Sequence, residues 1–214
     1  MSAPKTTTLP PLYAIVDVET TTRPDEYASR LIDAGIELVQ LRSKRLLFEE
    51  LCRLAERVLQ ARDSSGRHVQ IIINDSVEAC LKVGADGVHL GQEDASPVTA
   101  REVLGADRVI GLSTHTVEQI RSAPYESLSY IALGPIFQSK TKSGHAPIVG
   151  LPTLTEAARL CPLEVVAIGG ISAENAASVY QAGAQSVAVI ADLQRASDLA
   201  SRIRKYYESS RRTV

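Results

Sequence analysis

The chain has 214 residues, of which 44% are hydrophobic and 22% are charged, and 23 lysines and arginines against 25 aspartates and glutamates give a formal net charge of −2. This length is enough for one domain with a sizeable core and leaves little room for a second. The balanced charge argues against a nucleic-acid partner, because neutralising phosphates supplies much of the affinity of such proteins. Aromatic residues make up only 4% of the chain, which disfavours the stacking platforms of single-strand binders.

The sequence shows no sign of a membrane or export segment. No apolar run approaches the roughly 20 residues that a membrane-spanning helix needs. The N-terminus, from Met1 to Thr8, lacks the apolar core of a signal peptide. Cys52, Cys80 and Cys161 are far apart and have no metal-ligand spacing, which fits reduced thiols. We therefore expect a cytoplasmic protein with no membrane partner.

A glycine that follows a helical pattern recurs along the chain, at Gly35, Gly84, Gly105 and Gly183, and each copy leads into a short apolar run. Glycine just past a helix adopts the left-handed conformation at little cost. The intervals of 49, 21 and 78 residues correspond to two, one and three units of about 25 residues, a length that suits one strand plus one helix. Eight such units fill the chain.

Reading the apolar runs directly gives eight strands alternating with eight helices. The predicted strands are Leu12–Asp17, Leu38–Arg42, Val69–Asn74, Gly87–Leu90, Val109–Leu112, Tyr130–Leu133, Val165–Ile168 and Ser186–Ala191. The predicted helices are 25–34, 47–62, 76–83, 97–104, 116–122, 152–160, 173–182 and 195–207.

The strands are almost continuously apolar, which is typical of a parallel sheet covered on both faces. We therefore predict an α/β fold, a single small (β/α)8 TIM barrel. A doubly wound open sheet is the alternative, because periodicity alone does not exclude it. The predicted organisation is an N-terminal extension at 1–11, the barrel as catalytic domain at 12–208 and a C-terminal tail at 209–214.

The second predicted strand, Leu38–Arg42, ends in polar residues. Side chains alternate along a strand, so Leu38, Gln40 and Arg42 share one face. With helices over the apolar face, Gln40 and Arg42 point into the barrel. A buried arginine needs a negatively charged partner. That partner is either an anionic ligand or an internal salt bridge with a strand acid such as Asp17.

Two acidic residues, Asp75 and Asp94, follow neighbouring strands. Their oxygens can share one hard cation. The alternative for Asp75 is the N-cap of the next helix, with Glu78 three residues later forming a motif like a capping box. Capping is a weaker alternative for Asp94, because Ser96 followed by Pro97 already starts the next helix.

The later loops favour phosphate binding. The segment 134–147 combines glycine with hydroxyls and lysines, as a flap over a phosphate would, although a solvated loop explains the same composition. The seventh strand ends in Gly169 and Gly170, and Ser172 is the expected cap of the following helix, whose backbone N–H groups can bind an anion. Loops after strands seven and eight often bind phosphate in such barrels.

The strands offer no evident catalytic base or nucleophile. His89 alternates with Val88 and Leu90, so we expect it to pack between strand and helix. No lysine lies within a late strand, which disfavours a Schiff-base aldolase. The predicted site thus has two phosphate-binding ends, one with cations and a metal, and works by positioning its ligands and neutralising a leaving group.

Six segments resemble, in order, the motifs of the thiamine-phosphate synthase family. The resemblance runs from about residue 12 to residue 193, and its most specific part is Gly84–Asp94 taken with Gln40–Lys44. The matching segments are Gln40–Lys44, Ile73–Asp75, Gly84–Asp94, Gly111–Thr116, Gly134–Phe137 and Ala167–Ile171.

The resemblance implies a transferase that joins 4-amino-2-methyl-5-(diphosphooxymethyl)pyrimidine to a thiazole phosphate, giving thiamine phosphate and pyrophosphate. It implies Mg²⁺ as cofactor, with Asp75 and Asp94 as ligands. It also implies that Arg42, Lys44 and Lys142 are catalytic, because they stabilise the departing pyrophosphate. The residues implied for the pyrimidine diphosphate are Gln40, Arg42, Lys44, Asn74, Ser113 and Lys142. Those implied for the thiazole phosphate are Ser139, Thr141, Gly170, Ile190 and Ala191.

Two segments depart from the family's pattern, both at the thiazole end. The flap reads Phe-Gln-Ser-Lys-Thr-Lys over residues 137–142, where members commonly have Phe-Pro-Thr-x-Thr-Lys, so Ser139 keeps a hydroxyl and Lys140 adds a cation. Ala191 stands where a serine is usual. The backbone N–H survives that change, so the expected loss is one hydrogen bond, about 1 kcal/mol.

Two other functions stay open at this stage. A related thiazole tautomerase shares the barrel, but an isomerase has no use for a diphosphate and metal site. A non-catalytic barrel could bind a thiamine-pathway phosphate as a regulator, and would show affinity without turnover. The sequence also leaves a homo-oligomer open.

Overall fold

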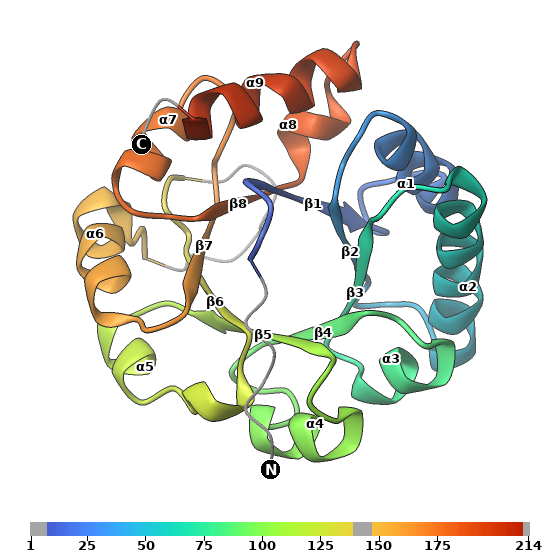
Figure 1. Cartoon of the computed structure of the whole chain (residues 1–214), viewed down its shortest axis with the longest axis horizontal. Coiled ribbons are helices and arrows are strands. Elements are labelled where there is room, and N and C mark those ends of the chain that lie inside the picture. The colour runs from blue at the N-terminus through green and yellow to red at the C-terminus, as the bar shows by residue number, and fades with distance from the viewer. Residues whose placement is uncertain (1–7, 139–146, 212–214) are drawn as a thin grey trace.

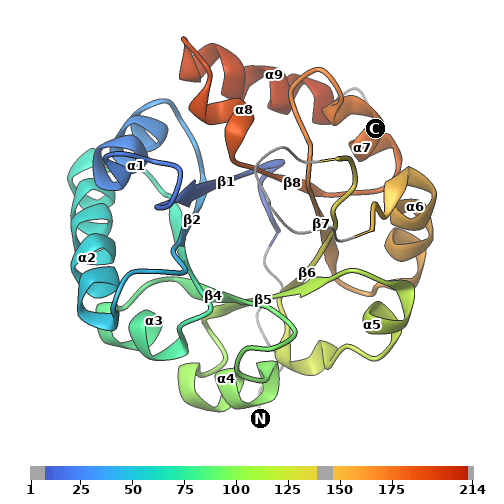
Figure 2. The ribbon, with the colours of Figure 1, turned by 180° about the vertical axis from the view of Figure 1, so that it is seen from behind.

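The structure is a computed structural model that describes residues 8–138 and 147–211. Its eight strands are parallel and pair in chain order, and β1 also pairs with β8, so the sheet closes into a barrel. The helices surround the ring of strands, as both views along the barrel show (Figures 1 and 2). This arrangement confirms the predicted (β/α)8 TIM barrel and excludes the open sheet.

The predicted alternation of strands and helices is present along the chain, with one additional short helix and one 3₁₀ turn. The strands are β1 (Leu12–Asp17), β2 (Leu38–Arg42), β3 (Gln70–Asn74), β4 (Gly87–Leu90), β5 (Val109–Thr114), β6 (Tyr130–Leu133), β7 (Glu164–Ile168) and β8 (Ser186–Val189). The helices are α1 (Pro24–Asp33), α2 (Phe48–Ser65), α3 (Val77–Val83), α4 (Pro97–Leu104), α5 (Val117–Arg121), η1 (Tyr125–Ser127), α6 (Gly150–Leu160), α7 (Ala176–Gln181), α8 (Ala191–Gln194) and α9 (Leu199–Arg211).

Alternating side chains along the strands build two separate cores. In β2, Leu38 belongs to the core inside the barrel, whereas Val39 and Leu41 belong to the core between strands and helices. Gln40 and Arg42 share the face of Leu38 and line a cavity at the end of the barrel. Their predicted inward direction is therefore confirmed.

The recurring glycines mark the ends of helices, as predicted. Gly35, Gly84, Gly105 and Gly183 have φ values of 95°, 69°, 76° and 105°. A residue with a Cβ atom is strained in this region, whereas glycine is not. Each of these glycines lets the chain leave a helix and turn back toward the barrel.

The end of the last strand differs from the prediction. β8 stops at Val189, two residues earlier than expected, and Ala191 begins the short helix α8. The backbone has already turned helical at Ile190, with φ −114° and ψ −79°. Four residues are too few to show a helical period, which is why the sequence does not predict α8.

The start of α7 also differs. The helix begins at Ala176 with Asn175 at its N-cap position, so the expected cap, Ser172, lies before it. Ser172 instead donates its backbone N–H to Asn175 Oδ1 at 2.9 Å. The residues that were predicted as the first turn of this helix form a separate turn.

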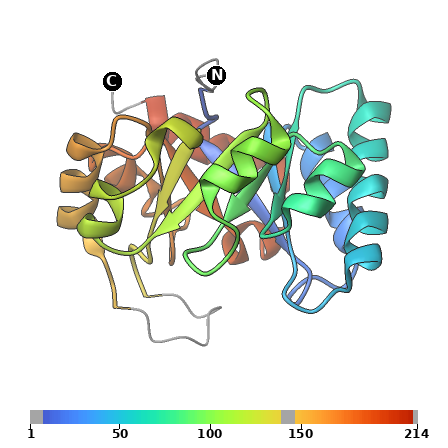
Figure 3. The same cartoon turned by 90° about the horizontal axis from the view of Figure 1, so that it is seen from below.

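Residues 9–11, just before β1, lie at the end of the barrel at which the strands begin. Leu9 is buried in the inner core, and its backbone N–H donates to the Glu164 carboxylate at 2.6 Å. The Pro11 carbonyl accepts the Tyr180 hydroxyl at 2.8 Å. Figure 3 shows from the side how the helices flank the strands. The domain limits at residues 11 and 208 remain a prediction; the last helix runs on to Arg211.

Two expectations about the environment of the chain can be compared with the structure. Within residues 8–138 and 147–211, no helix is long and apolar enough to cross a membrane. Cys52, Cys80 and Cys161 form no disulfide with one another. Burial raises the pKa of the Cys80 thiol to about 11, which keeps it in the unreactive protonated form.

Candidate active site

A cavity of about 180 Å³ opens at the carboxyl ends of the strands, where TIM barrels place their active sites. One half is polar and the other is apolar, which suits a phosphorylated ligand that carries a ring. The polar half comes from β2 to β5 and the loops after them, and includes Gln40, Arg42, Lys44, Asn74, Asp75, Asp94 and Ser113. The apolar half comes from β6 to β8 and includes Ala132, Val166, Ile168, Ala188 and Ile190. Eight of the predicted site residues thus meet in one cavity.

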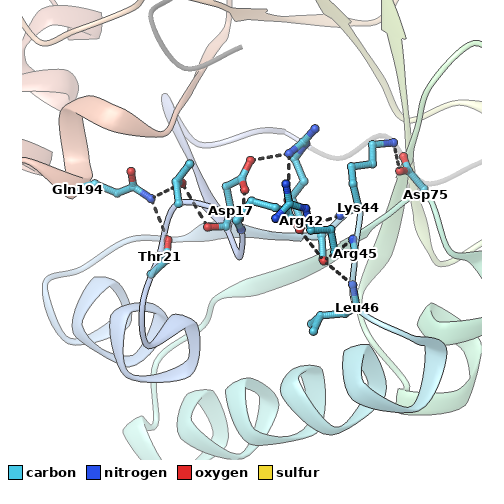
Figure 4. Close-up of polar contacts among 11 residues, drawn as sticks. Asp17, Thr21, Arg42, Lys44, Arg45, Leu46, Asp75 and Gln194 are labelled. Carbon is cyan, nitrogen blue, oxygen red and sulfur yellow. Dashed lines mark hydrogen bonds and ion pairs between the residues drawn. The ribbon is translucent and has the colours of Figure 1, made fainter. Parts of the chain in front are cut away.

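Arg42 is held by two carboxylates, one on the last residue of β1 and one just after that strand. Its Nη1 lies 2.5 Å from Asp17 Oδ2 and 3.6 Å from Glu19 Oε2, and the first of these pairs is drawn in Figure 4. Burial raises the pKa of Asp17, and the charge of Arg42 opposes that rise. The salt bridge that the sequence left open is therefore present. Because an arginine carries five N–H donors and these pairs use one nitrogen, Arg42 keeps donors for a ligand.

Lys44 connects the loop after β2 to the end of β3. Its Nζ donates to the Asp75 carboxylate (Figure 4). Asp75 has a φ of 63°, in the left-handed region that few residues other than glycine adopt. Aspartate tolerates this region better than most residues, although at some cost. This turn directly after β3 places the Asp75 carboxylate at the cavity.

The helix cap that the sequence offered as an alternative for Asp75 is made by Ser76. Ser76 Oγ accepts the Ala79 N–H at 3.1 Å, so the capping interpretation of Asp75 was wrong. Ser96 caps α4 as expected, because its Oγ accepts the Thr99 N–H at 3.1 Å. Both aspartates are thus left for another role.

Asp75 and Asp94 influence each other's ionisation. Burial raises the pKa of Asp75, and the neighbouring Asp94 adds to this rise while Lys44 opposes it. Burial also disfavours the charge on Asp94, but hydrogen bonds from Asp75 and from the Gly91 N–H, at 2.7 Å, outweigh it and lower the Asp94 pKa. Two carboxylates in this arrangement share a proton or bind a cation.

Among the described residues, the polar half of the cavity and its rim hold more carboxylates than cations. A diphosphate placed here would meet repulsion unless further positive charge came with it. Mg²⁺ is usually held by one or two carboxylates together with substrate phosphates, and the pair of aspartates fits that pattern. Within residues 8–138 and 147–211, no group of three or more His, Cys, Asp or Glu side chains could form a closed metal site. The charged side chains are Asp17, Glu19, Asp75 and Asp94 against Arg42 and Lys44.

Asn74 carries an unpaired donor at the cavity. The residue is 7% exposed, and its Nδ2 is buried with no hydrogen-bond partner among the described residues. Leaving such a group unpaired costs about 1–3 kcal/mol. An oxygen of a bound ligand would satisfy it, which supports the predicted role of Asn74 in binding.

His89 faces the inside of the barrel. Its Nδ1 lies 2.8 Å from the Tyr130 hydroxyl and its Nε2 lies 2.8 Å from Ser113 Oγ, whereas Val88 and Leu90 belong to the outer core. The predicted packing of His89 between strand and helix was therefore wrong. A histidine inside the barrel needs polar partners, and the sequence does not show that β5 and β6 supply them.

The predicted residues of the thiazole end are less fully placed. Gly170 and Ala191 follow the lining residues Ile168 and Ile190 along the chain but do not line the cavity themselves. Gly170 has a φ of 65°, and a Cβ atom there would lie 2.7 Å from the Gln138 carbonyl oxygen, so only glycine fits. Three further predicted residues lie outside the described residues: Ser139, Thr141 and Lys142.

Besides His89, the sequence interpretation missed three polar residues in or beneath the cavity. Tyr13 shares the strand face of Asp17, and Tyr130 shares that of Ala132, so counting by two along β1 and β6 would have placed both tyrosines inside. His115 lines the cavity, and its Nδ1 lies 2.6 Å from the Gly134 carbonyl. Because a carbonyl only accepts, this nitrogen carries the proton. No pattern in the sequence indicates that contact.

The family model for thiamine monophosphate synthase matches residues 12–193. The chain belongs to this family. The thiamine-phosphate synthase of Koribacter versatilis is 40% identical over 201 residues, which cover 89% of this chain and 94% of that protein. That of Caldicellulosiruptor saccharolyticus is 39% identical over 184 residues, covering 86% and 82%.

Solved structures agree with this assignment. Thiamine phosphate pyrophosphorylase from Pyrococcus furiosus has a TM-score of 0.83 and 26% sequence identity, over 95% of this chain and 96% of that one. The 3-hexulose-6-phosphate synthase from Salmonella typhimurium has a TM-score of 0.69 at 14% identity, over 95% and 99% of the two chains. That second likeness shows the shared barrel alone.

Proposed function

We propose that this member of the thiamine monophosphate synthase family is a transferase. It condenses the 4-amino-2-methylpyrimidine methyl diphosphate with a thiazole phosphate, and releases thiamine phosphate and pyrophosphate. The observation that carries the proposal is the cavity at the carboxyl ends of the strands, in which residues of five of the six family segments meet. The charged and amide side chains that these segments contribute are Gln40, Arg42, Lys44, Asn74, Asp75 and Asp94.

The pyrimidine diphosphate is assigned to the polar half of the cavity. Arg42, Lys44 and the unpaired Asn74 amide supply donors for the diphosphate oxygens. Gln40 and Ser113 supply polar contacts deeper in the barrel. The apolar walls from β6 to β8 exclude water around the rings, which strengthens each of these electrostatic contacts.

The acidic pair Asp75 and Asp94 is assigned to Mg²⁺. When bound, the ion neutralises charge on the diphosphate and so makes pyrophosphate a better leaving group. The surplus of carboxylates among the described residues of the cavity supports this assignment, because Arg42 is already paired with Asp17. Lys44 contacts Asp75 and can therefore serve both the acidic pair and the diphosphate.

The proposed chemistry needs no covalent nucleophile on the protein. The bond between the pyrimidine methylene carbon and the diphosphate oxygen breaks, and the electron pair leaves with pyrophosphate. The ring nitrogens and amino group of the pyrimidine delocalise the positive charge that remains on the methylene carbon. The thiazole nitrogen then forms the new bond with its lone pair. Arg42 and Lys44 stabilise the departing charge, together with Lys142, which lies outside the described residues.

The thiazole phosphate is assigned to the opposite rim. Ile190 lines the cavity there, and the backbone at Ala191 begins α8, so its N–H is not used within a preceding turn. Gly170 contributes backbone close to the loop after β6. The proposed hydroxyl contacts are those of Ser139 and Thr141, both outside the described residues.

The tautomerase alternative is not favoured. An isomerase of a thiazole phosphate needs neither a second substrate nor a diphosphate and metal site. Arg42, Lys44, Asn74 and the acidic pair are all present and grouped in one cavity.

The test is pyrophosphate release by the purified protein, with both substrates present and with each omitted in turn, in Mg²⁺ and in a chelator. We expect release only when both substrates and Mg²⁺ are present. Binding of the thiazole phosphate without any pyrophosphate release would contradict the proposal and favour a tautomerase or a binding protein.

A further inference from the structure

We propose that a chain of hydrogen bonds inside the barrel sets which end of the Gln40 amide faces the ligand, and that the site thereby selects a ring with an amino donor. The chain connects Gln40 to Ser113 through Tyr13, Tyr130 and His89. This inference rests on the proposed function, because it concerns how the same cavity recognises the pyrimidine. It adds three positioning residues, Tyr13, Tyr130 and His89, to the substrate-binding ones.

The chain of hydrogen bonds is continuous across the barrel. Gln40 Nε2 donates to the Tyr13 hydroxyl at 2.9 Å, and the Tyr13 and Tyr130 hydroxyls lie 3.0 Å apart. Tyr130 is 2.8 Å from His89 Nδ1, and His89 Nε2 is 2.8 Å from Ser113 Oγ. Gln40, Tyr13, Tyr130 and His89 are at most 7% exposed, so these bonds are largely shielded from water.

β5 lies between β4 and β6, and it makes the chain of hydrogen bonds possible because one of its residues, Gly111, has no side chain. Gly111 in β5 is paired with His89 on one side and with Tyr130 on the other. A Cβ atom at Gly111 would lie 2.1 Å from Tyr130 Cζ, so any side chain here would force the Tyr130 ring to move. The space above Gly111 is where the Tyr130 ring stacks on the imidazole of His89, with ring centres 5.6 Å apart and planes at 15°.

The direction of the protons follows from the Gln40 end. Because an amide nitrogen only donates, Tyr13 accepts from Gln40. With each hydroxyl using its single proton for the next link, Tyr13 donates to Tyr130, Tyr130 donates to Nδ1 of a neutral His89, and His89 Nε2 donates to Ser113. Burial raises the pKa of both tyrosines, so both keep their protons. Reversing the direction requires the Gln40 amide to turn over.

The two ends of this chain match one kind of ligand. With its nitrogen bound to Tyr13, Gln40 presents its carbonyl oxygen, which accepts an amino group. With its oxygen accepting from His89, Ser113 keeps its proton to donate to an oxygen such as that of a phosphate. An aminopyrimidine diphosphate meets both requirements. A ring with an oxo group in place of the amino group would face the carbonyl of Gln40 with a second acceptor.

The test compares the affinities of the full chain for the aminopyrimidine methyl diphosphate and for its 4-oxo analogue, measured by calorimetry in Mg²⁺ without thiazole phosphate. We expect the unmodified protein to prefer the amino compound roughly 100-fold or more, because an unmatched buried acceptor is strongly rejected. In Tyr13→Phe the Gln40 amide is free to turn, and the preference should fall below about 10-fold.

Two further variants keep the test decisive. Tyr130→Phe breaks the chain one link further on and should weaken the preference as well, which covers failure of Tyr13→Phe to fold. Tyr180→Phe is the matched control: it removes another buried hydroxyl, which donates to Pro11 outside the barrel, and should keep the full preference. Thermal melting establishes that each variant is folded.

The outcomes separate the inference from the proposed function. Unmodified protein that binds neither compound contradicts the proposed function itself. Unmodified protein that binds both equally overturns the inference alone. Variants that lose affinity for both compounds by the same factor, leaving the preference intact, show that the tyrosines are merely structural and also overturn it.

Discussion

At the scale of single residues, the most informative place is the turn after β3, where two adjacent residues have different roles. Ser76 caps α3, whereas Asp75 takes a left-handed backbone and faces a second carboxylate. Ser76 stabilises the helix, whereas the backbone of Asp75 is held in an unfavourable conformation. Backbone strain of this kind is typical of functional sites.

Asp75→Asn should therefore stabilise the fold and abolish turnover. Asparagine tolerates the left-handed region well, and it removes the repulsion from Asp94, while the exposed contact with Lys44 contributes little. We expect the melting temperature to rise by about 2–4 °C, as for a gain of about 1 kcal/mol. Pyrophosphate release should fall at least about 100-fold, because a metal ligand is lost. Unchanged turnover would remove Asp75 from the metal site.

Ser76→Ala provides the opposite result one residue away. Loss of the cap should lower the free energy of unfolding by about 1 kcal/mol, measured by denaturant unfolding. Turnover below the melting temperature should match that of the unmodified protein. A large loss of turnover here would show that the turn as a whole, and not the Asp75 carboxylate, supports activity.

Asp94→Asn isolates the second carboxylate. The amide oxygen can still accept the Gly91 N–H, so the loop should keep its shape. We expect the Mg²⁺ concentration that gives half-maximal rate to rise at least about tenfold, because one of two charged ligands is lost. An unchanged Mg²⁺ requirement in a folded variant would contradict the assignment.

At the scale of elements, β5 is the strand whose composition matters most to the site. Gly111 leaves the space in which Tyr130 meets His89. Gly111→Ala should displace the Tyr130 ring and destabilise the fold by about 1–3 kcal/mol, as inserting a methyl group into a packed core does. It should also weaken binding of the aminopyrimidine diphosphate, measured by calorimetry. Unaltered binding would show that the ring can shift without consequence.

Single elements also show what the sequence can predict. The limits of β1, β2, β4 and β6 follow from runs of apolar residues bounded by glycine or polar residues, and they agree with the structure. The inward direction of Gln40 follows from alternation along the strand. The partners of His89 do not, because they come from strands that are 24 and 41 residues away in the chain. Contacts between strands depend on register, which a single-strand pattern does not contain.

At the scale of the whole molecule, the two ends of the barrel have different tasks. The polar cavity is at the carboxyl ends of the strands, and Leu9 fills the opposite end together with the inner core. In TIM barrels the first end carries activity and the second supports stability. The resemblance in the sequence could predict the first end, but nothing in the N-terminal residues indicated that Leu9 packs inside.

Leu9→Ala should accordingly affect stability without affecting turnover. Removing a buried leucine side chain costs about 2–5 kcal/mol, depending on how far the core can close around the gap. Denaturant unfolding should show this loss, while the Michaelis constants for both substrates should stay the same at a temperature where the variant is folded. A change in either constant would show that the two ends are coupled.

The filled opposite end of the barrel also limits how ligands enter and leave. Because Leu9 and the inner core fill the opposite end, the open cavity at the carboxyl ends is the route by which we expect ligands to enter and leave. A ligand that lies deeper in this cavity than another would then have to bind before it. A ring bound near Gln40 would thus be covered by its co-substrate. The order of binding would then follow from how deep each ligand lies in the cavity.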